Sequence, residues 1–148
     1  DIKKIINDGH EIANHSMYDF PYDKYTEEEF LIDLEQTNTI LSKYTNNVPK
    51  LYRAPHAKLS KKMQNVLNNK GYTHVISDAF ANDTAIPDPI WISNFIINRT
   101  NTGSIILIHM PEKGVREWNY KAIELTLKGL TDYGYTILTI SDLFKNRN

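Results

Sequence analysis

Apolar side chains recur every three to four residues in several segments, which is the period of amphipathic helices. The clearest of these segments begins with the capping box Thr26-Glu27-Glu28-Glu29 and continues to about Tyr44. Glycines suited to a left-handed helix end follow three segments, at Gly9, Gly71 and Gly134. The pattern therefore predicts helices over residues 2–9, 26–44, 60–71, 90–97, 118–134 and 141–144.

Shorter runs rich in β-branched residues lie between the predicted helices and predict strands. The continuous run Ser104–His109 is typical of a strand buried in a parallel sheet. We expect 78–89 to be a loop and 10–15 to be a short strand or a tight loop. The other predicted strands are 50–53, 73–77 and 135–140. Because strands and helices alternate, the sequence predicts a parallel α/β sheet or barrel with its site at the carboxyl ends of the strands.

Composition and charge exclude several classes of partner. The 148 residues are 41% hydrophobic and 24% charged, as in one soluble globular domain, so we expect a single domain over 1–148. Seventeen basic residues balance 18 acidic ones, which leaves no net field for nucleic acid or an anionic membrane, whereas a neutral polymer is acceptable. No cysteine is present to form a thiolate site, and no apolar run is long enough to span a bilayer. The sequence does not indicate an oligomeric state.

Four polar residues fall at or shortly after successive predicted strands, where a barrel would bring them together. They are His15, Arg53, Asp83 and His109. His15 and Asp19 are four residues apart, so on one helical turn they would face the same way and could share a divalent metal ion, with zinc as the expected ion. The alternative for this pair is a helix cap beside a solvated side chain.

Arg53 and His109 each allow two interpretations. Arg53 is followed by a Pro-fixed turn, which could aim a backbone N–H at an oxyanion while the guanidinium holds a carboxylate. A surface arginine beside a turn proline is the alternative. His109 stands at the mouth of a buried strand, where it could protonate a leaving group with Asp83 holding its tautomer. Alternatively, His109 ends the strand with its ring hydrogen-bonded and has no chemical role.

Taken in order, these segments resemble the NodB-homology polysaccharide deacetylases of carbohydrate esterase family 4. Gly9-His10-Glu11-Ile12-Ala13-Asn14-His15-Ser16 is similar to that family's metal motif with its usual lead-in, and Arg53-Ala54-Pro55-His56-Ala57 is similar to its Arg-X-Pro-X-Gly motif. Asp83 falls where the family has an aspartate, and Leu107-Ile108-His109 matches the Leu-X-His ending. The resemblance covers essentially the whole chain.

The resemblance implies a distorted (β/α) barrel that removes acetyl groups from a polysaccharide. The expected polysaccharide contains N-acetylglucosamine. The resemblance makes His15 and Asp19 metal ligands and His109 the general acid. Asp83 would tune His109, Arg53 would orient the base, the backbone N–H of His56 would hold the oxyanion, and Leu107 would line the acetyl pocket. It also favours a secreted or cell-surface location. Among the aromatics that could stack on sugar or serve as packing (Trp91, Trp118, Tyr18 and Tyr22), Tyr18 is the candidate for substrate binding.

Several positions depart from the family pattern. Asp19 replaces the second metal histidine, and Ala57 replaces the turn glycine. The family's Thr-Phe-Asp-Asp segment, which carries the catalytic base, is absent, and the sequence begins at Asp1 rather than at Met. We therefore expect a domain whose first strand and helix are missing from this sequence. The alternative function is a non-catalytic glycan-binding or structural protein on the same fold.

Overall fold

The structure is a computed structural model that describes residues 2–46 and 48–146, so Asp1, where we expect a helix already under way, lies outside the described part. The chain forms two compact units, residues 1–76 and 77–148. Each unit contains one two-stranded parallel sheet, β1–β2 in the first and β3–β4 in the second. Parallel pairing in both units confirms the predicted α/β class.

The first unit opens with two helices, of which the first stops before Gly9 as predicted and the second ends at Leu41 rather than at about Tyr44. Helix α1 covers Ile2–Asn7, and Gly9 follows with a φ of +89°, a backbone conformation that glycine adopts without steric cost. Helix α2 covers Glu27–Leu41, and both hydrogen bonds of the capping box are present between Thr26 and Glu29. Local sequence therefore determines where both helices begin or stop.

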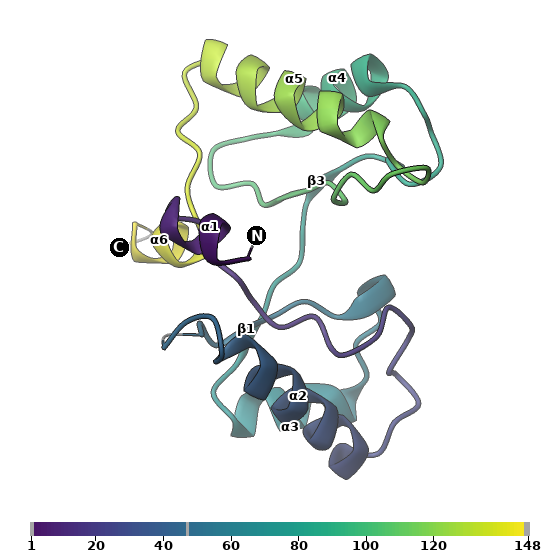
Figure 1. The fold of residues 1–148 in the computed structure, drawn as a ribbon, viewed down its shortest axis with the longest axis vertical. Helices are drawn as coiled ribbons and strands as arrows, with labels where there is room; N and C mark the ends of the chain where they lie inside the picture. Colours follow the sequence, from purple (N-terminus) through teal and green to yellow (C-terminus); the bar gives the residue numbers. More distant parts are fainter. Residues whose placement is uncertain (1, 47, 147–148) are drawn as a thin grey trace. The chain divides into compact units, whose positions relative to one another are not determined.

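The rest of the first unit is a β–turn–α–β segment (Figure 1). Strand β1 is Leu51–Tyr52, the short helical turn η1 is Pro55–Ala57, α3 is Lys61–Asn69 and β2 is Thr73–His74. Leu51 pairs with Thr73 and Tyr52 with His74, and α2 packs against α3. The core between these elements is built from Tyr22, Phe30, Leu34, Tyr52, Ala54, Met63, Val66, Leu67 and Tyr72.

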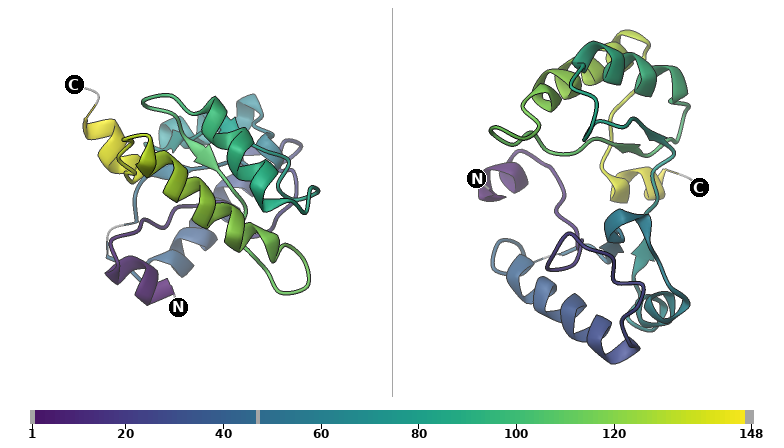
Figure 2. Two further views of the ribbon diagram at one scale, coloured as in Figure 1. Left: turned by 90° about the horizontal axis from the view of Figure 1, so that it is seen from above. Right: turned by 90° about the vertical axis from the view of Figure 1, so that its right-hand side faces the viewer.

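The second unit packs two long helices against each other and one of them against its sheet. Its elements are β3 (Ala79–Phe80), α4 (Pro89–Arg99), β4 (Ile106–Leu107), α5 (Trp118–Asp132) and α6 (Ile140–Lys145). Helix α5 lies along α4 in both views of Figure 2. The contact is close at Gly129, where an added Cβ would stand 2.4 Å from Ile97 Cδ1. The core is Ala79, Ala81, Ile92, Ile96 and Ala122.

Three predictions about strands need correction. Segment 135–140 forms no strand, because a β-branched run becomes a strand only where a second segment pairs with its backbone, and no described residue does so. Conversely, β3 lies inside the expected loop 78–89 and pairs Phe80 with Leu107. Strand β4 is also shorter than the predicted run Ser104–His109. No described helix is long and apolar enough to cross a bilayer.

Candidate active site

In the first unit, His15 and Arg53 meet at the carboxyl end of β1. Asn14 bridges Tyr52 in parallel, so the residues that follow each of them leave the sheet side by side. His15 Nδ1 lies 2.5 Å from the Arg53 carbonyl oxygen and donates to it in the tautomer that this acceptor selects. The ring orientation is therefore fixed by the neighbouring strand, and the lone pair of the neutral imidazole lies on Nε2.

The segment after His15 is not helical, so the helical turn that we assumed for His15 and Asp19 is wrong. Residues 17–20 form bends, and Ser16 has a φ of +66°. Buried side chains hold this segment in place of helical hydrogen bonds. Asp33 accepts a hydrogen bond from the Met17 backbone N–H at 3.1 Å, and the Tyr52 hydroxyl lies 2.8 Å from Ser16 Oγ. Burial raises the pKa of Tyr52 to about 12, so its hydroxyl stays protonated near neutral pH.

Asp19 interacts with two side chains of the segment after β1, those of His56 and Arg53. His56 Nε2 lies 3.6 Å from Asp19 Oδ1, with both side chains exposed. Burial lowers the pKa of Arg53, and the charge of Asp19 opposes that shift. A guanidinium is effectively always protonated in proteins, so Arg53 is cationic. Arg53, which we predicted to hold a carboxylate, therefore already interacts electrostatically with the carboxylate of Asp19.

Positive φ angles at residues other than glycine are confined to these two segments within the described chain. They occur at Ser16, His56 and Ala57, with φ of 66°, 52° and 55°. An L-residue in this region costs roughly 1–2 kcal/mol, and such strain clusters at functional sites. The backbone is thus strained in both motifs that resemble the deacetylase site, and Ala57 carries that strain at the position where the family has glycine.

A divalent metal fits the chemistry of part of this unit. The imidazole of His15 is oriented by a backbone carbonyl, which is the usual support for a metal-binding histidine. The carboxylate of Asp19 is 81% exposed and offers an oxygen donor on the same segment, beside the imidazole nitrogen of His15. No group of three or more His, Cys, Asp or Glu side chains converges among the residues that the structure describes. A catalytic zinc site needs about three protein ligands, so the ligand set requires a contribution beyond these two residues.

In the second unit, Asp83 and His109 form a hydrogen-bonded pair beyond the carboxyl ends of β3 and β4. His109 Nδ1 lies 3.0 Å from Asp83 Oδ1, and the His109 backbone N–H donates to Asp83 Oδ2 at 2.7 Å. Asp83 is 1% exposed, whereas the His109 side chain is 37% exposed. A buried carboxylate on Nδ1 directs Nε2 outward, which is the arrangement of an oriented acid–base histidine. The predicted contact between these two residues is present.

Two further side chains donate hydrogen bonds to Asp83. Trp118 Nε1 donates to the Asp83 carbonyl oxygen at 2.9 Å, and Asn119 Nδ2 donates to Asp83 Oδ2 at 2.8 Å. Trp118 was considered above for sugar stacking or packing, and the structure places it against this second core. Asn119 was not predicted, since a polar residue in the first turn of an amphipathic helix gives no sign of pointing inward.

The residues predicted to bind substrate differ in exposure. Tyr18 is 64% exposed and stacks on Phe20, with ring centroids 5.9 Å apart and planes inclined by 18°. Tyr22 is buried in the core. Leu107 is half-buried in β4, two residues before His109. Of these side chains, Tyr18 is the one that offers an aromatic face to solvent.

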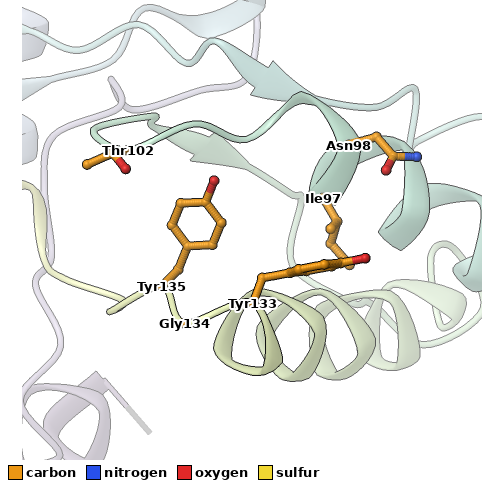
Figure 3. Close-up of a pocket in the computed structure, with 6 residues that line it drawn as sticks. All are labelled: Ile97, Asn98, Thr102, Tyr133, Gly134 and Tyr135. Atoms are coloured by element: carbon orange, nitrogen blue, oxygen red, sulfur yellow. The ribbon is translucent and has the colours of Figure 1, made fainter.

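A pocket of about 540 Å³ in the second unit contains none of the predicted residues. Thr102, Tyr133 and Tyr135 line it together with the end of α4, as Figure 3 shows. Thr102 precedes β4, whereas His109 follows it. The pocket is therefore at the entry to the strand rather than at the Asp83–His109 pair.

Comparison with known proteins decides the family. The family model described as polysaccharide deacetylase matches residues 1–75, about half of the chain. The chain belongs to the polysaccharide deacetylase family. It is 24% identical over 149 residues to a peptidoglycan-N-acetylglucosamine deacetylase of Bacillus cereus, covering 99% of this chain and 69% of that protein. Across the four curated relatives that it matches, the chain spans 28% to 69% of their length, and 43% of the first of them.

Solved structures confirm the predicted fold. A family 4 acetyl xylan esterase from Clostridium thermocellum, in complex with a cobalt ion, aligns with a TM-score of 0.85 at 27% identity, covering 97% of this deacetylase chain and 68% of the esterase. A family 4 pseudoenzyme from Bacillus anthracis aligns with the same TM-score at 18% identity, covering 96% and 49%, and shows the fold alone. The fold class is thus the predicted one, a partial (β/α) barrel of the NodB deacetylase type.

Proposed function

We propose that residues 1–148 are part of a metal-dependent deacetylase that hydrolyses acetyl groups on a polysaccharide containing N-acetylglucosamine. The observation that carries this proposal is the hydrogen bond from His109 to the buried carboxylate of Asp83, at the carboxyl ends of two parallel strands. A family member could bind glycan without this pair, whereas expelling an amine requires a proton donor held in one orientation. We take the whole range as one deacetylase domain.

His109 supplies the proton in this scheme. Water attacks the acetyl carbon and passes a proton to the base carboxylate that a full-length protein would supply. The tetrahedral intermediate then collapses, and the proton on His109 Nε2 passes to the leaving amine nitrogen as the carbon–nitrogen bond breaks and acetate departs. Asp83 holds the opposite nitrogen, Nδ1, and so stabilises the imidazolium before transfer. Leu107 would contact the acetyl methyl group from β4. The backbone N–H of His56 would donate to the oxyanion from the strained turn.

His15 and Asp19 are the residues of this chain that would bind a divalent ion. Zinc is the ion that we expect. When bound, such an ion would supply Lewis acidity toward the acetyl carbonyl. His15 is suited to the role because Arg53 fixes its tautomer through the carbonyl oxygen. Arg53 itself would hold the base carboxylate, and a full-length protein that carries the family's Asp-Asp segment would supply that base and a further ligand.

Substrate binding would use the exposed ring of Tyr18, which lies next to Asp19 on the metal segment. Its stacking on Phe20 limits its motion, and a rigid aromatic face is suited to the apolar face of a sugar ring. The balanced charge of the chain suits a neutral glycan. The peptidoglycan activity named for the Bacillus cereus relative supports a cell-wall glycan as substrate and a secreted or cell-surface location.

A second candidate function is a non-catalytic pseudoenzyme that binds glycan, or serves a structural role, without removing acetyl groups. Two substitutions favour it, Asp19 at the second metal position and Ala57 in the turn, and the Bacillus anthracis neighbour shows that this fold includes such proteins. The Asp83–His109 pair opposes it, because a buried carboxylate is costly to keep when its partner has no chemical task.

The test is the release of acetate from acetylated chitooligosaccharides by the full-length protein, with and without a chelator. The proposal expects release that chelation abolishes and that zinc restores. Asp19→His, which recreates the family ligand, should retain or increase turnover. Release that a chelator leaves unchanged would contradict the metal mechanism. Zinc binding by calorimetry without any acetate release would favour the pseudoenzyme.

A further inference from the structure

The side-chain amide of Asn119 links the two members of the catalytic pair. Asn119 Nδ2 lies 2.8 Å from Asp83 Oδ2 and 2.9 Å from the carbonyl oxygen of His109. Both partners accept hydrogen bonds only, a carboxylate and a carbonyl, so both N–H bonds of the amide are directed at the pair. This choice of acceptors also settles which end of the amide is nitrogen.

Burying Asn119 carries a free-energy cost. Asn119 is 0% exposed, and its other polar atom, Oδ1, is buried and has no hydrogen-bond partner among the residues that the structure describes. An unsatisfied buried acceptor costs about 1–3 kcal/mol. A leucine would fill the same volume of the core without that cost. What the asparagine offers that a leucine does not is its two N–H donors, which are directed at Asp83 and His109.

The Asp83 carboxylate is held from several directions at once. Oδ2 accepts from the His109 backbone N–H and from Asn119, while Oδ1 accepts from the His109 ring. Trp118 fixes the Asp83 backbone through its carbonyl oxygen. Without Asn119, the carboxylate could rotate about its terminal bond, because terminal sp³–sp² torsions are broad, and the ring would lose its aligned acceptor.

We infer that Asn119 is a positioning residue for the deacetylase reaction, which sets the Asp83 carboxylate and the His109 main chain so that the imidazole keeps one orientation and one tautomer. The inference rests on the proposed function for its kinetic consequence, but the geometry itself is independent of activity. Asn119 acts through Asp83 and His109 and does not touch the substrate.

The test combines a spectroscopic signal with kinetics in the full-length protein. Two variants remove the donors without adding a charge: Asn119→Leu, of similar volume, and Asn119→Ala, which is smaller. The ring Nδ1 proton of His109, assigned by its loss in His109→Ala, should be visible by NMR in the native protein as a hydrogen-bonded signal. In both variants we expect that signal to broaden or disappear, with kcat lowered about 10–100-fold and KM little changed.

Thr126→Val is the matched control. Thr126 lies on the same helix, is 2% exposed and has a buried hydroxyl without a partner, so valine should not destabilise α5 and should leave the His109 signal and kcat unchanged. If Asn119→Leu does not fold, as judged by near-UV circular dichroism, Asn119→Ala gives the result. A His109 signal that both folded variants retain would overturn the inference. Absence of acetate release by the native protein would contradict the proposed function, and the NMR comparison would still decide the role of Asn119.

Discussion

Ala57 occupies a left-handed backbone conformation, and its replacement by glycine should stabilise the protein. Its φ is +55°, in a turn closed by a hydrogen bond of 3.1 Å from its own N–H to the Ala54 carbonyl oxygen. The strain on an L-residue there is roughly 1–2 kcal/mol, while a glycine makes the unfolded chain less ordered at a cost of about 0.4–1 kcal/mol. The difference predicts that Ala57→Gly raises the free energy of unfolding by about 0.5–1 kcal/mol.

The assay is urea-induced unfolding of the full-length protein followed by circular dichroism. With a urea dependence of about 1–3 kcal/mol per molar, the midpoint should rise by a few tenths molar. Ala13→Gly is the control, because Ala13 is exposed in the same unit and has no positive φ, so it pays the entropy cost without relieving strain. A midpoint that falls equally in both variants would refute the claim that the turn stores strain.

Three further predictions concern the first unit. Burial lowers the pKa of His74 below its ordinary 6.5, so as the pH falls the unfolded chain takes up a proton before the folded chain does. The free energy of unfolding should therefore decrease as the pH drops below 6.5. His74→Gln should make this decrease smaller, as measured by urea titrations at several pH values. Tyr18→Ala should raise KM several-fold with kcat unchanged, whereas an unchanged KM would exclude sugar stacking. Asp33→Asn should weaken the hydrogen bond to Met17 and speed hydrogen exchange over residues 15–20, and unaltered exchange would exclude this anchoring role.

Local signals in the sequence predicted the helices well. Thr26 with Glu29, and Gly9 and Gly71 after their helices, act within a few residues, so their effect can be read without knowing the tertiary structure. Strands depend on partners far away in the sequence. Segment 135–140 has a strand composition but no described pairing segment, and Ala79–Phe80 pairs with β4 without any strand signal of its own.

In the candidate site, too, some features follow from the sequence and others depend on tertiary contacts. His15, Arg53, Asp83 and His109 could be chosen from the sequence because motif order and strand ends indicate them, and His15–Arg53 and Asp83–His109 do meet. The conformation after His15 was not predictable, because it depends on buried side chains such as Asp33 rather than on spacing. Asn119 was not predictable for the same reason.

The most direct test of the central claim is acetate release from acetylated chitooligosaccharides by the full-length native protein and by His109→Ala and Asp83→Asn. The account predicts measurable release by the native protein, none detectable for His109→Ala, and a loss of several orders of magnitude in kcat for Asp83→Asn, because a neutral partner no longer holds the tautomer. Equal release by the native protein and by folded His109→Ala would contradict it.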